Sequence, residues 1–195
     1  MNKTRLEAFS DGVLAIIITI MVLEIKVPHG STWELLRERW PVFISYFMSF
    51  LFVGIYWGNH HHLLHSVRRV TSGIIWANLN LLFWLSLIPF ATGWMGENDF
   101  ASNPVALYGG LLLCCGLAFT ILQKTVEKNA HDLAALKRAF INLEKKGMVS
   151  VVGYLLSLPL AYVNPVYSGA IFIAISILWL VPDRSIERAL RAEQP

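Results

Sequence analysis

Polar and ionisable residues gather where the first long apolar run of the chain begins. Arg5, Ser10 and Asp11 stand there with Phe9, and the stretch 13–23 that follows carries no charged residue. Charged side chains are costly inside a bilayer, so they mark a functional site or a paired structural site. The pattern predicts a membrane helix with a polar site at its start and an uncharged centre.

At 100° per residue, this first helix has two distinct faces. Asp11 lies on one face, where its carboxylate needs a polar partner within the protein. The other face is a stripe of mostly bulky side chains with Thr19 at its edge. The stripe consists of Arg5, Phe9, Gly12, Ile16, Ile20, Leu23 and Val27. On the residues alone, the simplest interpretation of this stripe is a lipid-facing or core-packed surface.

Partners for the polar site are expected on the second and third helices. The second apolar run ends in a tryptophan and a histidine cluster, and it runs back toward the depth of Asp11. Buried polar groups are costly unless they are paired. We therefore expect Asp11, Ser10 and Arg5 to form hydrogen bonds with these helices. The expected partners are Trp57, His60 or His61 of the second helix and Asn78 or Asn80 of the third.

A metal site is the alternative interpretation of the histidine cluster. His61 and His65 are four residues apart, a spacing that can hold zinc on one helix face. No cysteine and no second clear histidine pair completes the four ligands that zinc requires. Hydrogen-bonded histidines at the membrane interface are the simpler interpretation, and we expect neither a metal nor another cofactor.

The composition and the apolar runs indicate an all-α membrane protein. Of the 195 residues, 55% are hydrophobic and 15% are charged, against about 25% charged in soluble domains. A membrane helix needs about 20 apolar residues. Six such spans are expected, which would make residues 1–195 a single six-helix domain. The expected spans are 8–27, 40–64, 72–95, 104–123, 147–164 and 166–182.

Charge asymmetry sets the expected orientation. Six spans place both termini on one side, and that side would hold 13 of the 16 Lys and Arg residues. The other side would keep Lys26, Arg37 and Arg39. Positive charge favours the cytoplasmic side, so we expect both termini there. Residues 124–146 are expected to form an amphipathic cytoplasmic helix, and residues 31–39 a short extracellular one. Membrane-length segments interrupt the basic residues, which argues against nucleic-acid binding.

The spacing of Arg5, Phe9, Ser10 and Asp11 resembles a family signature. Arg-x-x-x-Phe-Ser-Asp at the start of the first membrane helix is similar to the pattern of the transmembrane protein 175 family of potassium channels, in its bacterial single-repeat form. The resemblance implies a bacterial inner-membrane channel in which first helices line a central pore at a four-fold axis. One chain supplies one such helix, so the expected assembly is a homotetramer in the lipid bilayer.

The same resemblance implies roles for the stripe. Ile16 and Leu23 match the rings of aliphatic side chains that narrow such a pore, with Thr19 or Ile20 between them. The chain contains no Thr-Val-Gly-Tyr-Gly filter. Any selectivity for potassium would therefore come from a hydrophobic constriction, which can gate by dewetting. The resemblance also supports a structural network of Phe9, Ser10 and Asp11 with the Trp and His of the second helix.

The expected function is passive conduction of potassium and other monovalent cations. Two alternatives remain: a proton-coupled secondary transporter and a non-conducting membrane assembly protein. Such transporters usually carry internal repeats, broken helices and midplane carboxylates. The span centres here hold no Asp, Glu, Lys or Arg. The chain also has no His-Glu-x-x-His, no Ser-His-Asp order and no phosphate-binding glycine loop, so we expect no enzyme.

Overall fold

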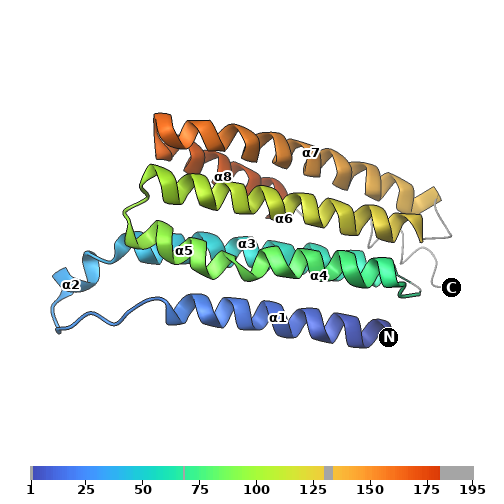
Figure 1. Ribbon diagram of the computed structural model, residues 1–195, viewed down its shortest axis with the longest axis horizontal. Coiled ribbons are helices and arrows are strands. Elements are labelled where there is room, and N and C mark those ends of the chain that lie inside the picture. The colour runs from blue at the N-terminus through green and yellow to red at the C-terminus, as the bar shows by residue number, and fades with distance from the viewer. Residues whose placement is uncertain (1, 68, 130–133, 181–195) are drawn as a thin grey trace.

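Long helices running side by side make up an elongated bundle (Figure 1). The computed structural model describes residues 2–67, 69–129 and 134–180, and within these ranges it contains helices and no strand. The expected all-α class is confirmed. In chain order the helices are α1 Lys3–Leu23, α2 Trp33–Arg37, α3 Trp40–His65, α4 Ser72–Ser86, α5 Ile88–Glu97, α6 Ser102–Lys128, α7 Ala134–Val163 and α8 Pro165–Leu180.

Five helical stretches in the described residues are long and apolar enough to cross a membrane. They are Lys3–Leu23, Trp40–His65, Ser72–Glu97, Ser102–Lys128 and Phe140–Val163. The sixth apolar helix, α8, has 16 residues, fewer than the roughly 20 that a perpendicular span needs. Residues 181–182 of the sixth expected span lie outside the described residues. The short helix α2 follows Thr32 at its N-cap position, and that side chain makes no capping hydrogen bond.

A proline divides the third span into α4 and α5. Pro89 has no N–H and its ring clashes with the carbonyl four residues earlier, which kinks or breaks a helix, and here the helix is interrupted. The helix α4 ends at Ser86, and the Leu87 N–H instead bonds to the Trp84 carbonyl at 3.2 Å. The span resumes with Pro89 in the first turn of α5. Pro159, by contrast, lies inside α7 without ending it.

The expectation of a separate cytoplasmic helix over 124–146 is wrong. The first residues of that segment finish α6, and its last part belongs to α7, which runs without a break from Ala134 to Val163. No proline precedes Pro159 in this stretch, so the backbone can continue from polar into apolar sequence. Four of the basic residues that set the expected orientation, Arg68, Arg184, Arg188 and Arg191, lie outside the described residues.

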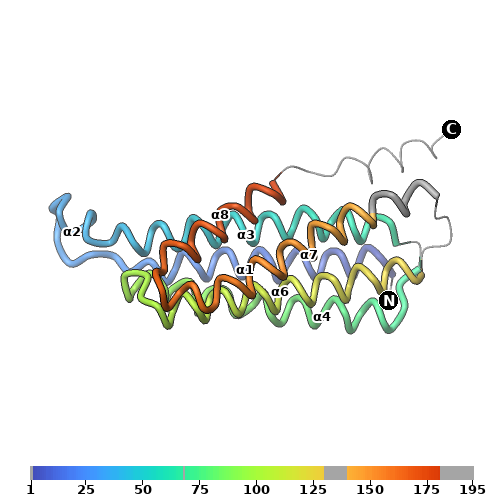
Figure 2. Tube along the Cα trace, turned by 90° about the horizontal axis from the view of Figure 1, so that it is seen from above, coloured from blue at the N-terminus to red at the C-terminus, as the bar shows by residue number. Residues whose placement is uncertain are grey.

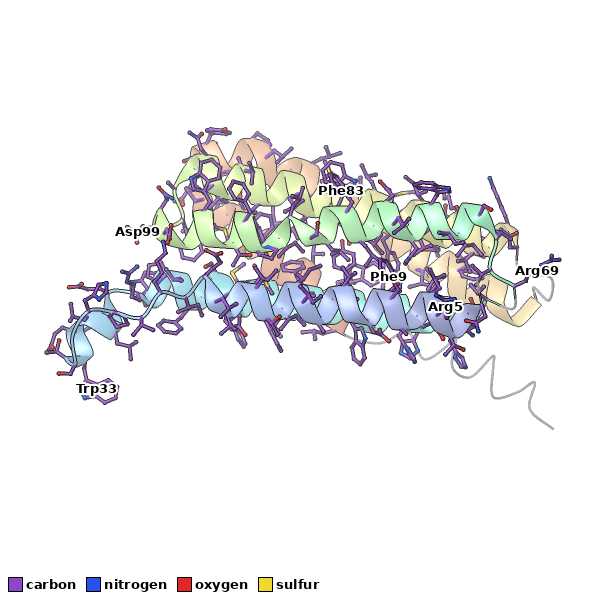
Figure 3. The ribbon with its side chains drawn as sticks, turned by 60° about the horizontal axis from the view of Figure 1, so that its bottom comes forward. Arg5, Phe9, Trp33, Arg69, Phe83 and Asp99 are labelled. Atoms are coloured by element: carbon purple, nitrogen blue, oxygen red, sulfur yellow. The ribbon has the colours of Figure 1, made fainter. Side chains whose placement is uncertain are left out.

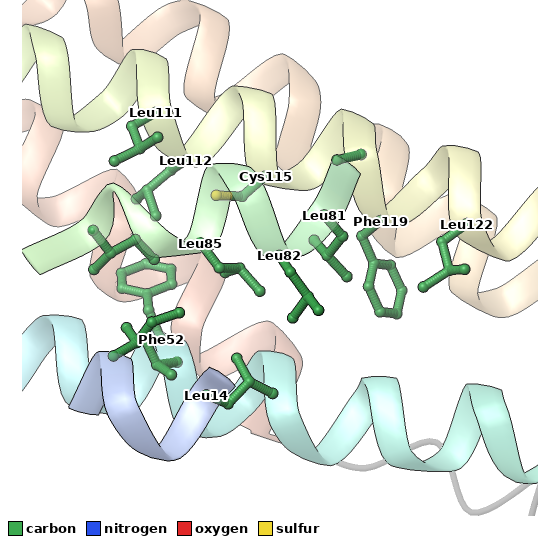
Figure 4. Close-up of a cluster of buried hydrophobic side chains, with 14 of the residues drawn as sticks. Leu14, Phe52, Leu81, Leu82, Leu85, Leu111, Leu112, Cys115, Phe119 and Leu122 are labelled. Carbon is green, nitrogen blue, oxygen red and sulfur yellow. The ribbon is translucent and has the colours of Figure 1, made fainter. Parts of the chain in front are cut away.

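The pore-lining candidate α1 lies along one edge of the bundle. It packs against α3, α4 and α5, and in the second view α3 lies on one side of it and α4 on the other (Figure 2). Its buried residues, Leu6, Ser10, Leu14, Ile17 and Met21, recur every three to four positions. Leu14 reaches a core that also includes Phe52, Leu85 and Cys115 (Figure 4).

Candidate functional site

The stripe of α1 is exposed along the whole helix. Ile16 is 58%, Ile20 41% and Leu23 77% exposed, and Phe9 and Thr19 are exposed with them. Figure 3 shows Arg5 and Phe9 near the beginning of this helix. The Thr19 hydroxyl donates to the Ile16 carbonyl at 2.9 Å, which leaves its oxygen as an acceptor on the exposed side. The chain therefore offers an apolar surface with one polar oxygen, that of Thr19, at its edge.

A buried hydrogen-bonded chain fixes the opposite face of α1. The Asn78 amide donates to Ser10 Oγ at 2.9 Å, and the Ser10 hydroxyl donates to the Leu6 carbonyl at 2.9 Å. The Asn78 carbonyl oxygen lies 2.6 Å from Nε2 of His60. All three polar side chains are buried, Ser10 and Asn78 completely. This chain joins α1, α3 and α4, and of the sequence alternatives it selects His60 and Asn78.

Asp11 lies at the rim between α1 and α3 rather than inside the bundle. Its carboxylate accepts a hydrogen bond from the Trp57 indole N–H at 3.0 Å, and the pair is exposed on the subunit surface. His61 contacts the Trp57 ring with centroids 6.3 Å apart and stacks on His65 at 6.2 Å. The structure thus brings Asp11 to Trp57 and not to a histidine.

The expected place of Arg5 in this network is wrong for the described residues. The Arg5 side chain is exposed at the first turn of α1, and its backbone N–H bonds to the Asn2 side chain that caps the helix. Arg5 shares the stripe with Leu23 on the helix face that points away from Ser10, so helical geometry separates it from Asn78. Within the described residues, no group of three or more His, Cys, Asp or Glu is placed to hold a metal.

A second group of buried, hydrogen-bonded polar side chains, which was not expected from the sequence, lies beside the C-terminal half of α1. Thr92 donates to Ser49 Oγ at 2.6 Å, or to the Ile88 carbonyl at 2.7 Å, and its hydroxyl also lies 4.0 Å from Met21 Sδ. Ser49 shares a 2.9 Å hydrogen bond with the Tyr108 hydroxyl. The only sequence signal was single hydroxyl residues in three separate apolar spans, which have no fixed spacing from one another.

An ion pair joins the segment that follows α1 to the last residue of α5. Lys26 Nζ lies 2.8 Å from Glu97 Oε1, and both side chains are largely exposed. The hydrogen bond and the negative charge of Glu97 raise the pKa of Lys26. The contact is therefore complete below the ordinary lysine pKa and is lost as the pH rises through the raised value.

A groove of about 560 Å³ runs between α1 and α5, beside the stripe. Ile16 and Ile20 line one wall, and Phe90 and Trp94 line the other. Gly93 forms part of the same wall, and a Cβ added there would meet nothing within 4 Å. The exposed apolar surface thus extends from the stripe onto α5.

Comparison with known proteins decides the family. The protein-family model described as endosomal/lysosomal potassium channel TMEM175 matches residues 5–89, which contain the polar site and the stripe. A potassium channel of Chryseobacterium sp. (strain P1-3) is 48% identical over 191 residues, covering 98% of this chain and 99% of that relative. The chain belongs to the TMEM175 family. A potassium channel of Streptomyces collinus is 35% identical, covering 84% of this chain and 85% of its own.

A solved member of the TMEM175 family has the same architecture. The crystal structure of a lysosomal potassium-selective channel TMEM175 homolog from Chamaesiphon minutus matches with a TM-score of 0.81 at 28% identity. The match covers 94% of this chain and 97% of that one. Because TMEM175 proteins are ion channels, this chain is a membrane channel subunit that conducts passively, and it is not an enzyme.

Proposed function

We propose that this protein is a potassium-permeable channel whose central pore is lined by the first helices of four identical subunits. The observation that carries this proposal is the exposed stripe of α1: Ile16, Ile20 and Leu23 lie uncovered on one face, with Thr19 at its edge, inside the segment that the family model matches. Potassium as the permeant ion is supported by the names of the bacterial relatives. No cofactor is needed for such conduction.

Four copies of the stripe would form stacked rings around the axis. Ile16 and Leu23 are seven residues apart, which is about 10 Å along a helix. Ile20 and the Thr19 oxygen lie between them. A narrow ring of branched aliphatic side chains resists water, and it passes partly dehydrated ions when it widens. The ring of Thr19 oxygens would then stand in for part of the lost hydration shell.

Six membrane helices per subunit complete this proposal, with residues 1–195 as one channel domain. The helix α8 forms the sixth span by crossing together with α7, against which it packs. Both termini would then lie in the cytoplasm of a bacterial cell, with the channel in the inner membrane. The inner ends of α1 and α3 meet where Lys3 donates to the His65 carbonyl at 2.7 Å.

Ion flux from purified protein in liposomes tests the proposal. Ile16→Asn and Leu23→Asn should hydrate the constriction and raise cation flux under a potassium gradient, at the expense of the potassium-to-sodium ratio. Ile177→Asn on α8 is the matched control, because Ile177 has the same 58% exposure as Ile16. Equal flux in Ile16→Asn, Leu23→Asn and the unchanged protein would show that α1 does not line the ion path.

A further inference from the structure

Two rows of exposed aromatic side chains flank α1. The α3 ladder consists of Phe47, Phe50 and Trp57, which are 60%, 41% and 49% exposed. The α4–α5 ladder consists of Trp76, Phe83 and Phe90, which are 71%, 56% and 65% exposed. Figure 2 shows α3 and α4 on opposite sides of α1. Each subunit therefore carries one aromatic surface on each side of its candidate pore helix.

Rotational symmetry relates these two surfaces. In a closed ring with more than two copies, each subunit presents one flank to the next copy and the other flank to the previous one. With α1 nearest the axis, the α3 ladder of one subunit faces the α4–α5 ladder of its neighbour. This argument rests on the four-fold assembly of the proposed function. It requires that the two different surfaces match in depth, because rotation about the membrane normal leaves depth unchanged.

The hydrogen bonds within one subunit fix the relative depths of the outer halves of the ladders. The Thr92–Ser49 bond sets α5 level with α3. Phe50 follows Ser49, and Phe90 precedes Thr92 by two residues, so their backbones differ in depth by a few Å at most. Phe90 also lines the groove beside Ile16 and Ile20, so contacts at this level would continue from the candidate ion path.

The inner halves match as well, with a glycine opposite a phenylalanine. The hydrogen bond between Trp57 and Asp11 places these two residues at the same depth. The hydrogen bond between Asn78 and Ser10 does the same for that pair. At 1.5 Å per residue, Phe83 lies about 7 Å outward of Ser10 and Gly54 about 6 Å outward. A Cβ added at Gly54 would meet nothing within 4 Å, so a large side chain from outside has room there. Glycine lets helices approach closely within membranes.

We propose that the subunit interface is heterologous, with Phe83 of one subunit packed over Gly54 of the next and Phe90 packed against Phe50. The occupant of both aromatic ladders is thus a second copy of this chain. Aromatic pairs stabilise a contact beyond the apolar area that they bury. Four repeats of the contact would hold the α1 helices around the axis without any contact across the pore.

Cysteine cross-linking in liposomes tests the direction of the interface. In a Cys114→Ala, Cys115→Ala background, the double variant Phe50→Cys with Phe90→Cys should give linked chains up to four under a short thiol cross-linker. Each single variant should stay unlinked, because a heterologous contact pairs different positions. Phe90→Cys with Ile177→Cys is the control pair and should also stay unlinked. Linked dimers in a single variant would overturn the heterologous interface.

Filling the glycine site gives an independent test if the cysteine variants fold poorly. Gly54→Leu should reduce the fraction of tetramer in native mass spectra at least tenfold relative to Gly169→Leu, a control glycine on α8 that also has open space around its Cβ. An unchanged fraction would mean that lipid covers the ladders. A tetramer with normal flux but without cross-links overturns this interface alone. A monomer or dimer of the unchanged protein overturns the four-fold pore and the interface together.

Discussion

Removing Asn78 is the sharpest test of the buried hydrogen-bond network that joins α1, α3 and α4. The variant Asn78→Leu keeps the side-chain size but deletes both the hydrogen bond to Ser10 and the one to His60. Ser10 keeps its bond to the Leu6 carbonyl, so it loses one of two partners. His60 is 98% buried and is left without its Asn78 partner. The loss should therefore fall mainly on the contact between α3 and α4.

The expected cost of Asn78→Leu follows from the two bonds. Interhelical hydrogen bonds in membranes contribute about 0.6 kcal/mol on average and about 1.7 at most. A buried group left unpaired costs about 1–3 kcal/mol. Two average bonds set the lower end and the unpaired His60 the upper end, so unfolding should become easier by about 1–3 kcal/mol. Unfolding by SDS in mixed micelles, followed by circular dichroism, measures the difference.

A double-mutant cycle isolates the pair. Combining Asn78→Leu with His60→Phe should give a coupling of about 0.5–2 kcal/mol, because these residues share a direct bond. Asn80→Leu is the control on the same helix, where Asn80 is half-buried, and its effect should stay within about 0.5 kcal/mol. A coupling near zero, or equal losses of unfolding free energy in Asn78→Leu and Asn80→Leu, would refute the view that the hydrogen bonds of Ser10, His60 and Asn78 hold α1, α3 and α4 together.

Two further predictions concern the contacts around α1 and α5. Asp11→Ala should lower the tetramer yield measured by native mass spectrometry and leave the potassium-to-sodium flux ratio unchanged, because it removes the acceptor of the Trp57 N–H, which lies away from the stripe. Asp11→Asn keeps an oxygen acceptor and should restore the yield. A changed flux ratio with a normal tetramer yield would contradict this prediction. Gly96→Ala should destabilise SDS unfolding by about 1–3 kcal/mol, because its Cβ would meet Ser45 Oγ and lie 2.8 Å from Val42 Cα, whereas Gly93→Ala has open space and should be neutral.

The membrane helices could be predicted because hydropathy and proline act locally. An apolar run such as 13–23 must form a helix in lipid, because only a helix satisfies its backbone hydrogen bonds within the segment, whatever its neighbours are. The boundary of α7 was not predictable in the same way. Polar residues before 147 suggested a separate surface helix, yet nothing in their backbone chemistry ends a helix, and α7 simply continues through them. An amphipathic sequence indicates that the surroundings of a helix change along its length, but it does not indicate that the helix ends.

The buried polar contacts were predictable in part. The group around Ser10 has a local sequence signature, and the group around Thr92 has none. Ser10 and Asp11 follow each other on one helix, so their need for nearby partners was visible, and Trp57, His60 and Asn78 were among the candidates. Choosing among the candidates required rotations of α3 and α4 that no spacing reveals. Ser49, Thr92 and Tyr108 come from three separate helices, and each alone is an ordinary hydroxyl residue that could bond to its own backbone.

The directional contacts of α1 lie off the stripe, and this separation carries a physical consequence. Ser10 and Asp11 hold its N-terminal half, and Met21 contacts Thr92 near its C-terminal end. Lys26, in the segment after the helix, bonds to Glu97. Between these levels the stripe carries aliphatic side chains with Thr19 at its edge, so in the proposed assembly the size of the rings would change with side-chain volume while the helix stays in place. Stability and assembly should therefore respond to substitutions on one face of α1, and permeation to substitutions on the other.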